Sequence, residues 1–139
     1  MPYPELMVAP MRQDLARLGV KELRTAADVD AFINEKSGTS LLVVNSVCGC
    51  AAGAARPAVA LAMQHGKQPD RIATVFAGQD TDAVARARSY FPELPPSSPS
   101  FILIKDGQLA DYIPRHRIES RNAQTIAADL TAIFDRITA

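Results

Sequence analysis

The strongest constraint on the fold lies in residues 41–57 (LLVVNSVCGCAAGAARP), where a short apolar run passes directly into an alanine-rich segment. The run at 41–44 is apolar and β-branched toward its end, which is typical of a buried strand, and we expect a strand over about 41–46. Both cysteines of the chain, Cys48 and Cys50, follow this strand. Beyond them the apolar residues recur at helical spacing: Ala51, Ala54, Ala55, Ala58, Val59, Ala62 and Met63. The cysteines therefore stand at a strand-to-helix junction.

This junction favours an anion. The backbone N–H groups of the first helical turn lack partners within the helix, and the positive end of the helix dipole lies there. For a thiol, the anion that benefits is the thiolate. We therefore expect the start of this helix to lower the pKa of a cysteine placed on it.

A second strand, a hairpin and a final helix follow in the rest of the chain. Residues 71–77 form an apolar run, so a strand, a helix of about 15 residues and another strand make a βαβ unit with parallel strands. Asp80 is placed to cap a helix over about 81–90. The dipeptide at 106–107, Asp-Gly, separates strand-like runs at 100–105 and 108–113 and is typical of a two-residue hairpin turn. The last helix carries apolar residues at spacings of four, three and four: Ile126, Leu130, Ile133 and Ile137.

Two further helices are expected before the first strand. Residues 4–18 have apolar residues on one helical face, and Gly19 ends the run. Pro10 lies inside this segment, so the helix either is kinked there or begins there. Thr25 and Asp28 form a capping-box-like start for the second helix. The apolar face of the first helix is formed by Met7, Met11, Leu15 and Leu18.

The resulting order is helix, helix, strand, helix, strand, helix, strand, strand, helix. From the first strand onward this is the order of a thioredoxin-like domain, with redox cysteines at the start of the first crossover helix. We therefore predict an α/β fold consisting of one thioredoxin-like domain over residues 1–139. It would have three layers (α/β/α), a mixed four-stranded central sheet and two extra N-terminal helices. A generic α/β sandwich is the alternative that the pattern alone leaves open.

Composition narrows the class of function. Fifteen Lys and Arg residues balance fifteen Asp and Glu residues, which gives no electrostatic basis for binding nucleic acid or an anionic membrane surface. The N-terminal sequence lacks the basic start and apolar core of a signal peptide, and no apolar run approaches the roughly 18 residues of a spanning helix. Two cysteines separated by one residue also differ from the disulfide framework of a secreted domain. We expect a cytoplasmic protein, either a monomer or a homodimer.

Residues 43–57 (VVNSVCGCAAGAARP) resemble the signature of the bacilliredoxins, bacterial thioredoxin-like proteins with Cys-Gly-Cys in place of Cys-x-x-Cys. Four further blocks agree, in order along nearly the whole chain: 7–12 (MVAPMR), 75–80 (VFAGQD), 96–100 (PSSPS) and 113–116 (IPRH). The resemblance implies an oxidoreductase that removes bacillithiol from protein mixed disulfides, or a general protein disulfide isomerase. Its partners would be bacillithiolated or disulfide-bonded proteins, with bacillithiol as a covalent thiol substrate and no other cofactor.

Cys48 is the candidate attacking thiolate, because it is the more N-terminal cysteine and is expected to be the more exposed. A lowered pKa helps attack only modestly, since nucleophilicity falls as the thiolate fraction rises, and the larger benefit comes when Cys48 must leave. Cys50 is the candidate resolving thiol, which would close a Cys48–Cys50 bond and free bacillithiol. Gly49 would permit the torsions of that tight ring. Alternatively, free bacillithiol attacks Cys48 directly and Cys50 is dispensable.

The cysteine pair has two other interpretations. The pair could be inert and buried, or it could belong to a thiolate metal-binding module. A metal site needs more than two ligands, and His65 and His116 are far from the cysteines in sequence. We therefore predict no metal ligands.

Ser98-Pro99 is the second predicted element of the site. In thioredoxin-like folds a cis-proline before this strand faces the cysteines, so the resemblance implies that Pro99 is cis and that Ser98 contacts the substrate. Arg56 is either a solvated helix residue or a partner of the thiolate. His116 is a capping or surface histidine, with proton donation as the alternative. Pro57 is expected to kink the cysteine helix.

Overall fold

Strand β2 (Thr39–Asn45) runs through the middle of a five-stranded sheet of order β1-β3-β2-β4-β5, and all its residues are buried. The computed structural model of the chain describes residues 2–138. In it, β3 (Arg71–Phe76) lies parallel to β2, and β1 (Lys21–Glu22) lies parallel to β3. On the other side β4 (Ser100–Lys105) is antiparallel to β2, and β5 (Gln108–Ile113) is antiparallel to β4. The predicted βαβ unit and hairpin are therefore confirmed.

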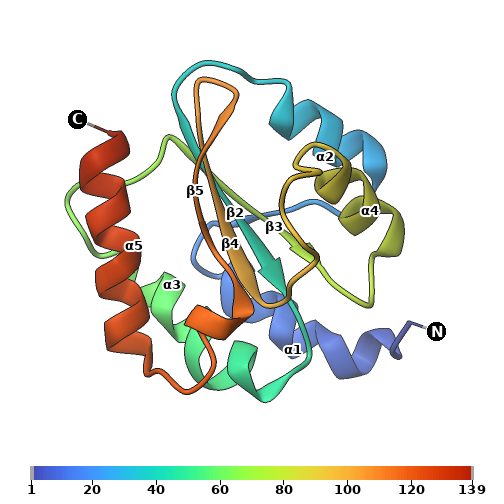
Figure 1. Cartoon of the computed structure of the whole chain (residues 1–139). Helices are drawn as coiled ribbons and strands as arrows, with labels where there is room; N and C mark the ends of the chain where they lie inside the picture. Colours follow the sequence, from blue (N-terminus) through green and yellow to red (C-terminus); the bar gives the residue numbers. More distant parts are fainter. Residues whose placement is uncertain (1, 139) are drawn as a thin grey trace.

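Helices cover both faces of the sheet (Figure 1). Helices α2 (Ala26–Ile33) and α4 (Thr81–Ser89) pack together on one face. Helices α3 (Arg56–Ala62) and α5 (Ala123–Ile137) pack together on the other face. The three-layer arrangement follows from the alternation of side chains along the strands, because successive residues point to opposite faces.

Two apolar clusters form the core, one on each face of the sheet. Leu41 and Val43 of β2 belong to the cluster under α3 and α5, whereas Leu42 and Val44 belong to the cluster under α2 and α4. The four apolar residues predicted to line the last helix are all buried in the first cluster. A strand buried on both faces needs a continuous apolar sequence, which is what 41–44 provides.

The sheet has one strand more than predicted. The expectation of a four-stranded sheet was wrong because β1 is only two residues long and carries the charged pair Lys21 and Glu22. Such a segment has neither the alternation nor the β-branched composition by which strands are recognised. It is a strand because β3 offers it a free edge.

The first helix, α1 (Glu5–Ala16), runs through Pro10 instead of beginning there. Its buried residues are Val8, Arg12 and Leu15, and Leu18, just beyond the helix, is partly buried against the core, so the predicted face was right for Leu15 and Leu18 but wrong for Met7 and Met11. Met7 is 47% exposed. The buried face is rotated relative to the predicted one and includes an arginine. The spacing of apolar residues cannot reveal a buried charged residue.

The hairpin turn and one tight approach depend on glycine-compatible backbone. Asp106 and Gly107 both have positive φ, 51° and 80°, as a two-residue turn of the type I′ class requires. Gly38 has φ of 79°, and a Cβ there would clash with the Asp70 carboxylate. Gly38 therefore admits no larger residue without rearrangement.

The helix that follows the cysteines begins with a π-helical turn, η1 (Ala51–Ala55), before it becomes α3. In this turn the N–H of Arg56 donates to the carbonyl of Ala51, five residues back. Pro57 comes next and has no N–H to donate. The π-helical turn therefore ends at a position where the helical series of backbone hydrogen bonds would be interrupted in any case. The irregularity expected at Pro57 is thus a change of helix type just before the proline.

Candidate active site

The two cysteines lie between the end of β2 and the π-helical turn. Both are free thiols and both are half-buried. The carbonyl of Cys48 accepts hydrogen bonds from the N–H groups of Ala51 (3.1 Å) and Ala52 (3.3 Å), and the backbone of Cys50 is already helical. Cys48 therefore opens the helix, as predicted, and Cys50 occupies its first turn.

The surroundings of Cys48 favour its thiolate. Burial of the sulfur raises its pKa, but hydrogen bonds from the Ser46 hydroxyl and from the backbone N–H groups of Ala51 and Cys50 outweigh burial. The pKa of Cys48 is therefore lower than usual. Ser46 also accepts a hydrogen bond from the N–H of Cys48 (3.3 Å), which fixes the hydroxyl beside the sulfur.

Cys50 is shifted in the opposite direction. Burial raises the pKa of Cys50, and so do the negative charge of Cys48 and a hydrogen bond to it. The guanidinium of Arg115 opposes this effect, with Nη2 4.0 Å from Cys50 Sγ. Of the two thiols, Cys48 is therefore the one that loses its proton more readily.

With both cysteines as free thiols, nothing around Gly49 requires a glycine at this position. Gly49 is exposed, and a Cβ on it would meet no atom within 4 Å. Within residues 2–138, Gly49 is not among the glycines with positive φ. A need for glycine at this position would therefore arise only when the two sulfurs join.

The predicted second element lies beside Cys48. The Ser98–Pro99 peptide bond is cis, as expected. Ser98 and Cys48 line the same surface depression, of about 320 Å³, and Pro99 itself is buried. The structure therefore brings Cys48 and Ser98 to one site.

A buried arginine supports the cysteine loop from behind. Arg56, only 4% exposed, donates hydrogen bonds to Asn45 Oδ1 (2.9 Å), to the carbonyl oxygen of Ser46 (3.0 Å) and to Asp14 of α1 (3.0 Å). Asn45 Oδ1 also accepts a hydrogen bond from the N–H of Ser46 (2.9 Å). The interpretation of Arg56 as a solvated residue was wrong. Its guanidinium holds the residue whose hydroxyl stabilises the Cys48 thiolate.

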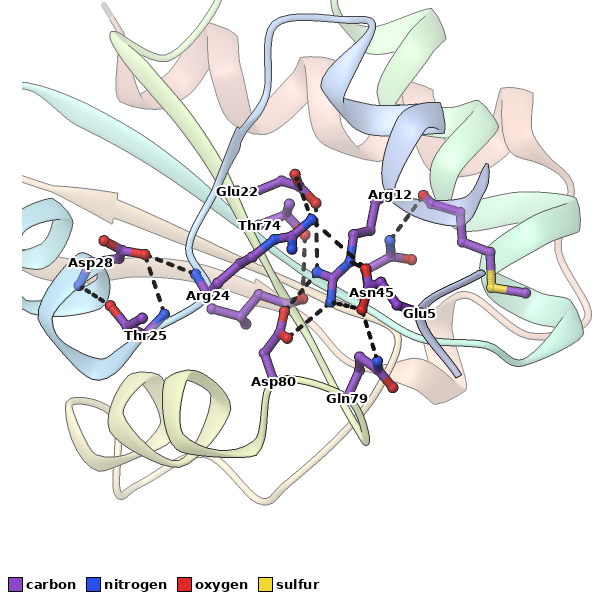
Figure 2. A network of polar contacts seen from close by, with 12 residues as sticks. Glu5, Arg12, Glu22, Arg24, Thr25, Asp28, Asn45, Thr74, Gln79 and Asp80 are labelled. Atoms are coloured by element: carbon purple, nitrogen blue, oxygen red, sulfur yellow. Dashed lines mark hydrogen bonds and ion pairs between the residues drawn. The ribbon is translucent and has the colours of Figure 1, made fainter. Parts of the chain in front are cut away.

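A second buried arginine joins α1 to the start of α4 (Figure 2). Arg12 forms ion pairs with Asp80 (2.7 Å) and Glu5 (2.6 Å), and its guanidinium lies 5.3 Å from the centre of the Phe76 ring. Asp80 is the N-cap residue of α4, as predicted, but its side chain makes no capping hydrogen bond. The carboxylate instead binds Arg12 with both oxygens.

Several residues of the site were missed or assigned differently from the sequence. Arg115, and not the neighbouring His116, reaches the cysteines. His65 pairs with Asp135 at 2.8 Å, on helix α5. Ser46 lay inside the predicted junction, and a hydroxyl two residues before Cys48 was the available signal for it. Over the described residues 2–138, no group of three or more His, Cys, Asp or Glu side chains is placed to hold a metal ion.

Solved structures with the same architecture include thioredoxins. A thioredoxin from Fasciola hepatica superposes with a TM-score of 0.59 at 25% identity, covering 85% of this chain and 99% of that one. An oxidised thioredoxin from Plasmodium falciparum superposes with a TM-score of 0.57 at 17% identity, covering 86% of this chain and 99% of that one. The fold and the paired cysteines define the class: a thioredoxin-fold thiol–disulfide oxidoreductase.

Sequence comparison defines the family within this class. Residues 3–138 match the family described as "Disulphide isomerase". A bacilliredoxin from Salinibacter ruber is 56% identical over 97% of this chain and 81% of its own length. Bacilliredoxins from Cytophaga hutchinsonii and Bacillus cereus (strain ATCC 10987) are each 50% identical, over 97% and 96% of this chain and 99% and 94% of their own lengths. The chain belongs to the bacilliredoxin family. No helix among the described residues is long and apolar enough to cross a membrane.

Proposed function

We propose that this protein removes bacillithiol from mixed disulfides on other proteins, with Cys48 as the attacking sulfur. The Cys48 thiolate attacks the bacillithiol sulfur of the mixed disulfide. A Cys48–bacillithiol bond forms, the original S–S bond breaks, and its electron pair leaves on the sulfur of the substrate protein, which takes up a proton. The exchange uses sulfur chemistry alone, without a metal or an organic cofactor.

The observation that carries this proposal is the opposite shift of the two thiols. Cys48 has a lowered pKa and Cys50 a raised one. The thiolate, not the thiol, is the nucleophile in disulfide exchange. The pair therefore offers its nucleophile on Cys48, while Cys50 holds its proton more tightly.

The same surroundings favour Cys50 as the resolving thiol. Two of the influences that raise its pKa, the charge of Cys48 and the hydrogen bond to it, disappear once Cys48 carries bacillithiol. Burial, Arg115 and Glu119 then remain; burial and the Glu119 charge still raise the pKa of Cys50, and Arg115 stabilises its thiolate. Cys50 would lose its proton and attack Cys48 Sγ. The Cys48–Cys50 disulfide then forms, bacillithiol leaves as a thiolate, and the substrate protein has been reduced by the two electrons that the dithiol gives up.

A direct test uses a substrate protein carrying one bacillithiol and intact-mass measurement of both partners. The Cys50→Ala variant should retain bacillithiol on Cys48, because the intramolecular step is lost. The Cys48→Ser variant should leave the substrate unchanged. Release of bacillithiol by Cys48→Ser, or a bacillithiol adduct on Cys50 in the unaltered protein, would contradict the assignment.

The requirement for Cys50 is tested with the same substrate. If free bacillithiol can attack Cys48 directly, adding it to Cys50→Ala should restore repeated turnover. If Cys50 is the only resolving thiol, the variant stops after one equivalent whether or not bacillithiol is present. Either result leaves Cys48 as the attacking sulfur.

General disulfide isomerisation is the second candidate, and the description of the matched family favours it. In that reaction Cys48 attacks a protein disulfide and is displaced by another thiol of the same protein. Parallel assays would separate the two functions, one measuring bacillithiol release and the other the recovery of a protein with scrambled disulfides. Recovery of the scrambled protein at a higher rate than the release of bacillithiol would favour the isomerase.

A further inference from the structure

The depression beside Cys48 has an unusual charge. Two arginines, Arg88 and Arg115, contribute to its lining together with Cys48, and no Asp or Glu is among the described residues that line it. The whole chain, by contrast, has equal numbers of basic and acidic residues. Two guanidinium groups therefore lie where the reactive sulfur is accessible, one of them, that of Arg115, also paired with Glu119 outside the lining.

Arg88 is available to a ligand. Arg86, two residues earlier on α4, is held by Asp30. Arg88 is half-buried, and within residues 2–138 its guanidinium has no ion-pair or hydrogen-bond partner. An arginine with five N–H donors lining a depression, without a carboxylate to bind, is suited to an incoming anion.

Arg115 is fixed at the same depression from a different element, the 3-10 turn η2 (Arg115–Arg117). Its backbone N–H donates to Ser97 Oγ (2.7 Å), and its guanidinium donates to the carbonyl of Ser98 (3.4 Å) and to Glu119 (3.1 Å). Another part of the guanidinium lies beside Cys50. The side chain is thus oriented by the loop before β4 and remains next to the reacting sulfurs.

We propose that Arg88 and Arg115 make this depression a subsite for a low-molecular-weight thiol that carries carboxylates. The inference rests on the proposed function, since it takes Cys48 as the sulfur that reacts with that thiol. Guanidinium groups bind carboxylates through paired hydrogen bonds, which an ammonium cannot match. A volume of about 320 Å³ is at the lower end of small-ligand sites, so it suits a small molecule better than a protein segment.

The test compares the charge of the incoming thiol in a single chemical step. The probes are mixed disulfides of 2-thiopyridine with mercaptosuccinate (two carboxylates), 2-mercaptoethanol (neutral) and cysteamine (cationic). Cys48 attacks the sulfur of the probe thiol, the bond to thiopyridine breaks, and the electron pair leaves on 2-thiopyridone, whose absorbance gives the rate. The Cys50→Ala background stops the reaction at this mixed disulfide.

The measured quantity is the rate with mercaptosuccinate divided by the rate with 2-mercaptoethanol. This ratio cancels any change in the reactivity of Cys48 itself. Arg88→Gln and Arg115→Gln should each lower the ratio about two- to fivefold, the effect of losing one partly exposed ion pair. Arg86→Gln removes the same charge from the same helix outside the depression and should leave the ratio within about 1.5-fold. Added salt should lower the ratio of the parent protein.

Several results would overturn the inference. One is an unchanged ratio in Arg88→Gln, and another is an equal loss in Arg86→Gln. A third is a rate that falls in Arg88→Gln and Arg115→Gln with an acidic peptide disulfide but not with the mercaptosuccinate probe. That result would assign the subsite to protein partners. If Cys48 reacts with the neutral probe in all variants, the proposed function survives any of these outcomes. If Cys48 reacts with no probe, the proposed function fails as well.

Discussion

Replacing Arg56 with methionine tests whether a buried cation sets the reactivity of Cys48 through Ser46. Methionine retains much of the apolar stem but removes all three hydrogen bonds of the guanidinium. Among the described residues Arg56 makes no hydrogen bond to Cys48, so its hydrogen bonds reach the sulfur only through the position of Ser46. We expect a less stable protein in which the pKa of Cys48 is higher than in the parent.

The stability cost follows from the partners. Two hydrogen bonds go to buried acceptors, Asn45 Oδ1 and the carbonyl of Ser46, and one goes to Asp14, whose side chain is 40% exposed. Buried hydrogen bonds from a charged donor contribute about 1.5–3 kcal/mol each, whereas a pair with an exposed carboxylate contributes about 0–1 kcal/mol. Because Asn45 Oδ1 keeps its bond from the N–H of Ser46, we expect a loss of about 2–4 kcal/mol in the free energy of unfolding. For a chain of this length that lowers Tm by about 6–15 °C.

The decisive measurement is thiolate absorbance against pH in the Cys50→Ala background, which isolates the titration of Cys48. Arg12→Met is the matched control, because Arg12 is 5% exposed, also pairs with carboxylates and makes no hydrogen bond to Ser46 among the described residues. It should cost as much stability and leave the pKa of Cys48 unchanged. Ser46→Ala should raise that pKa with little loss of stability. An unchanged pKa in Arg56→Met, or an equal rise in Arg12→Met, would refute the reasoning.

Two further predictions concern the cysteine pair and a glycine. Alkylation at a pH below the ordinary pKa of a thiol should label Cys48 before Cys50. Once Cys48 is labelled its charge is gone, so Cys50 should react at a lower pH than it does beside an unlabelled Cys48. Mass mapping over a pH series checks both outcomes, and labelling of Cys50 before Cys48 would contradict them. Gly38→Ala should lower the free energy of unfolding in urea by about 2–4 kcal/mol, because it combines a strained φ with a contact on Asp70, whereas Gly19→Ala, with φ of 86° and open space, should lose only about 1–2 kcal/mol. Equal losses in the two glycine variants would show that the contact with Asp70 is relieved without cost.

Local sequence patterns were sufficient to predict most of the helices, strands and turns. The apolar run at 41–44, the helical spacing after Cys50, the Asp-Gly turn and the capping box at Thr25 are each confirmed, because each depends on interactions between residues close in sequence. The capping box is the clearest case, since the Thr25 and Asp28 side chains each bind a backbone N–H of the same turn. For such features the tertiary structure adds little to what the local residues already favour.

The supporting residues of the site could not be found in this way. Arg56 lies in an alanine-rich helix, where a lone charge indicates a solvated position, and its carboxylate partner Asp14 is 42 residues away. Asp80 has the residue type and position of a helix cap, yet Arg12, 68 residues earlier, binds its carboxylate. Charge pairs of this kind are decided by which helix ends meet in space, and neither periodicity nor propensity carries that information.

Helix α1 has a consequence for any attempt to shorten this protein. Three neighbouring positions of α1 reach into the body of the fold: the carbonyl of Met11 accepts from Asn45 (3.4 Å), Arg12 binds Asp80, and Asp14 binds Arg56. A version without α1 would leave the Asp80 carboxylate without Arg12 and would leave Arg56, which holds the turn before Cys48, without Asp14. Helix α1 therefore supports the loop that carries the two cysteines. A shortened redox protein made from this chain would have to retain this helix.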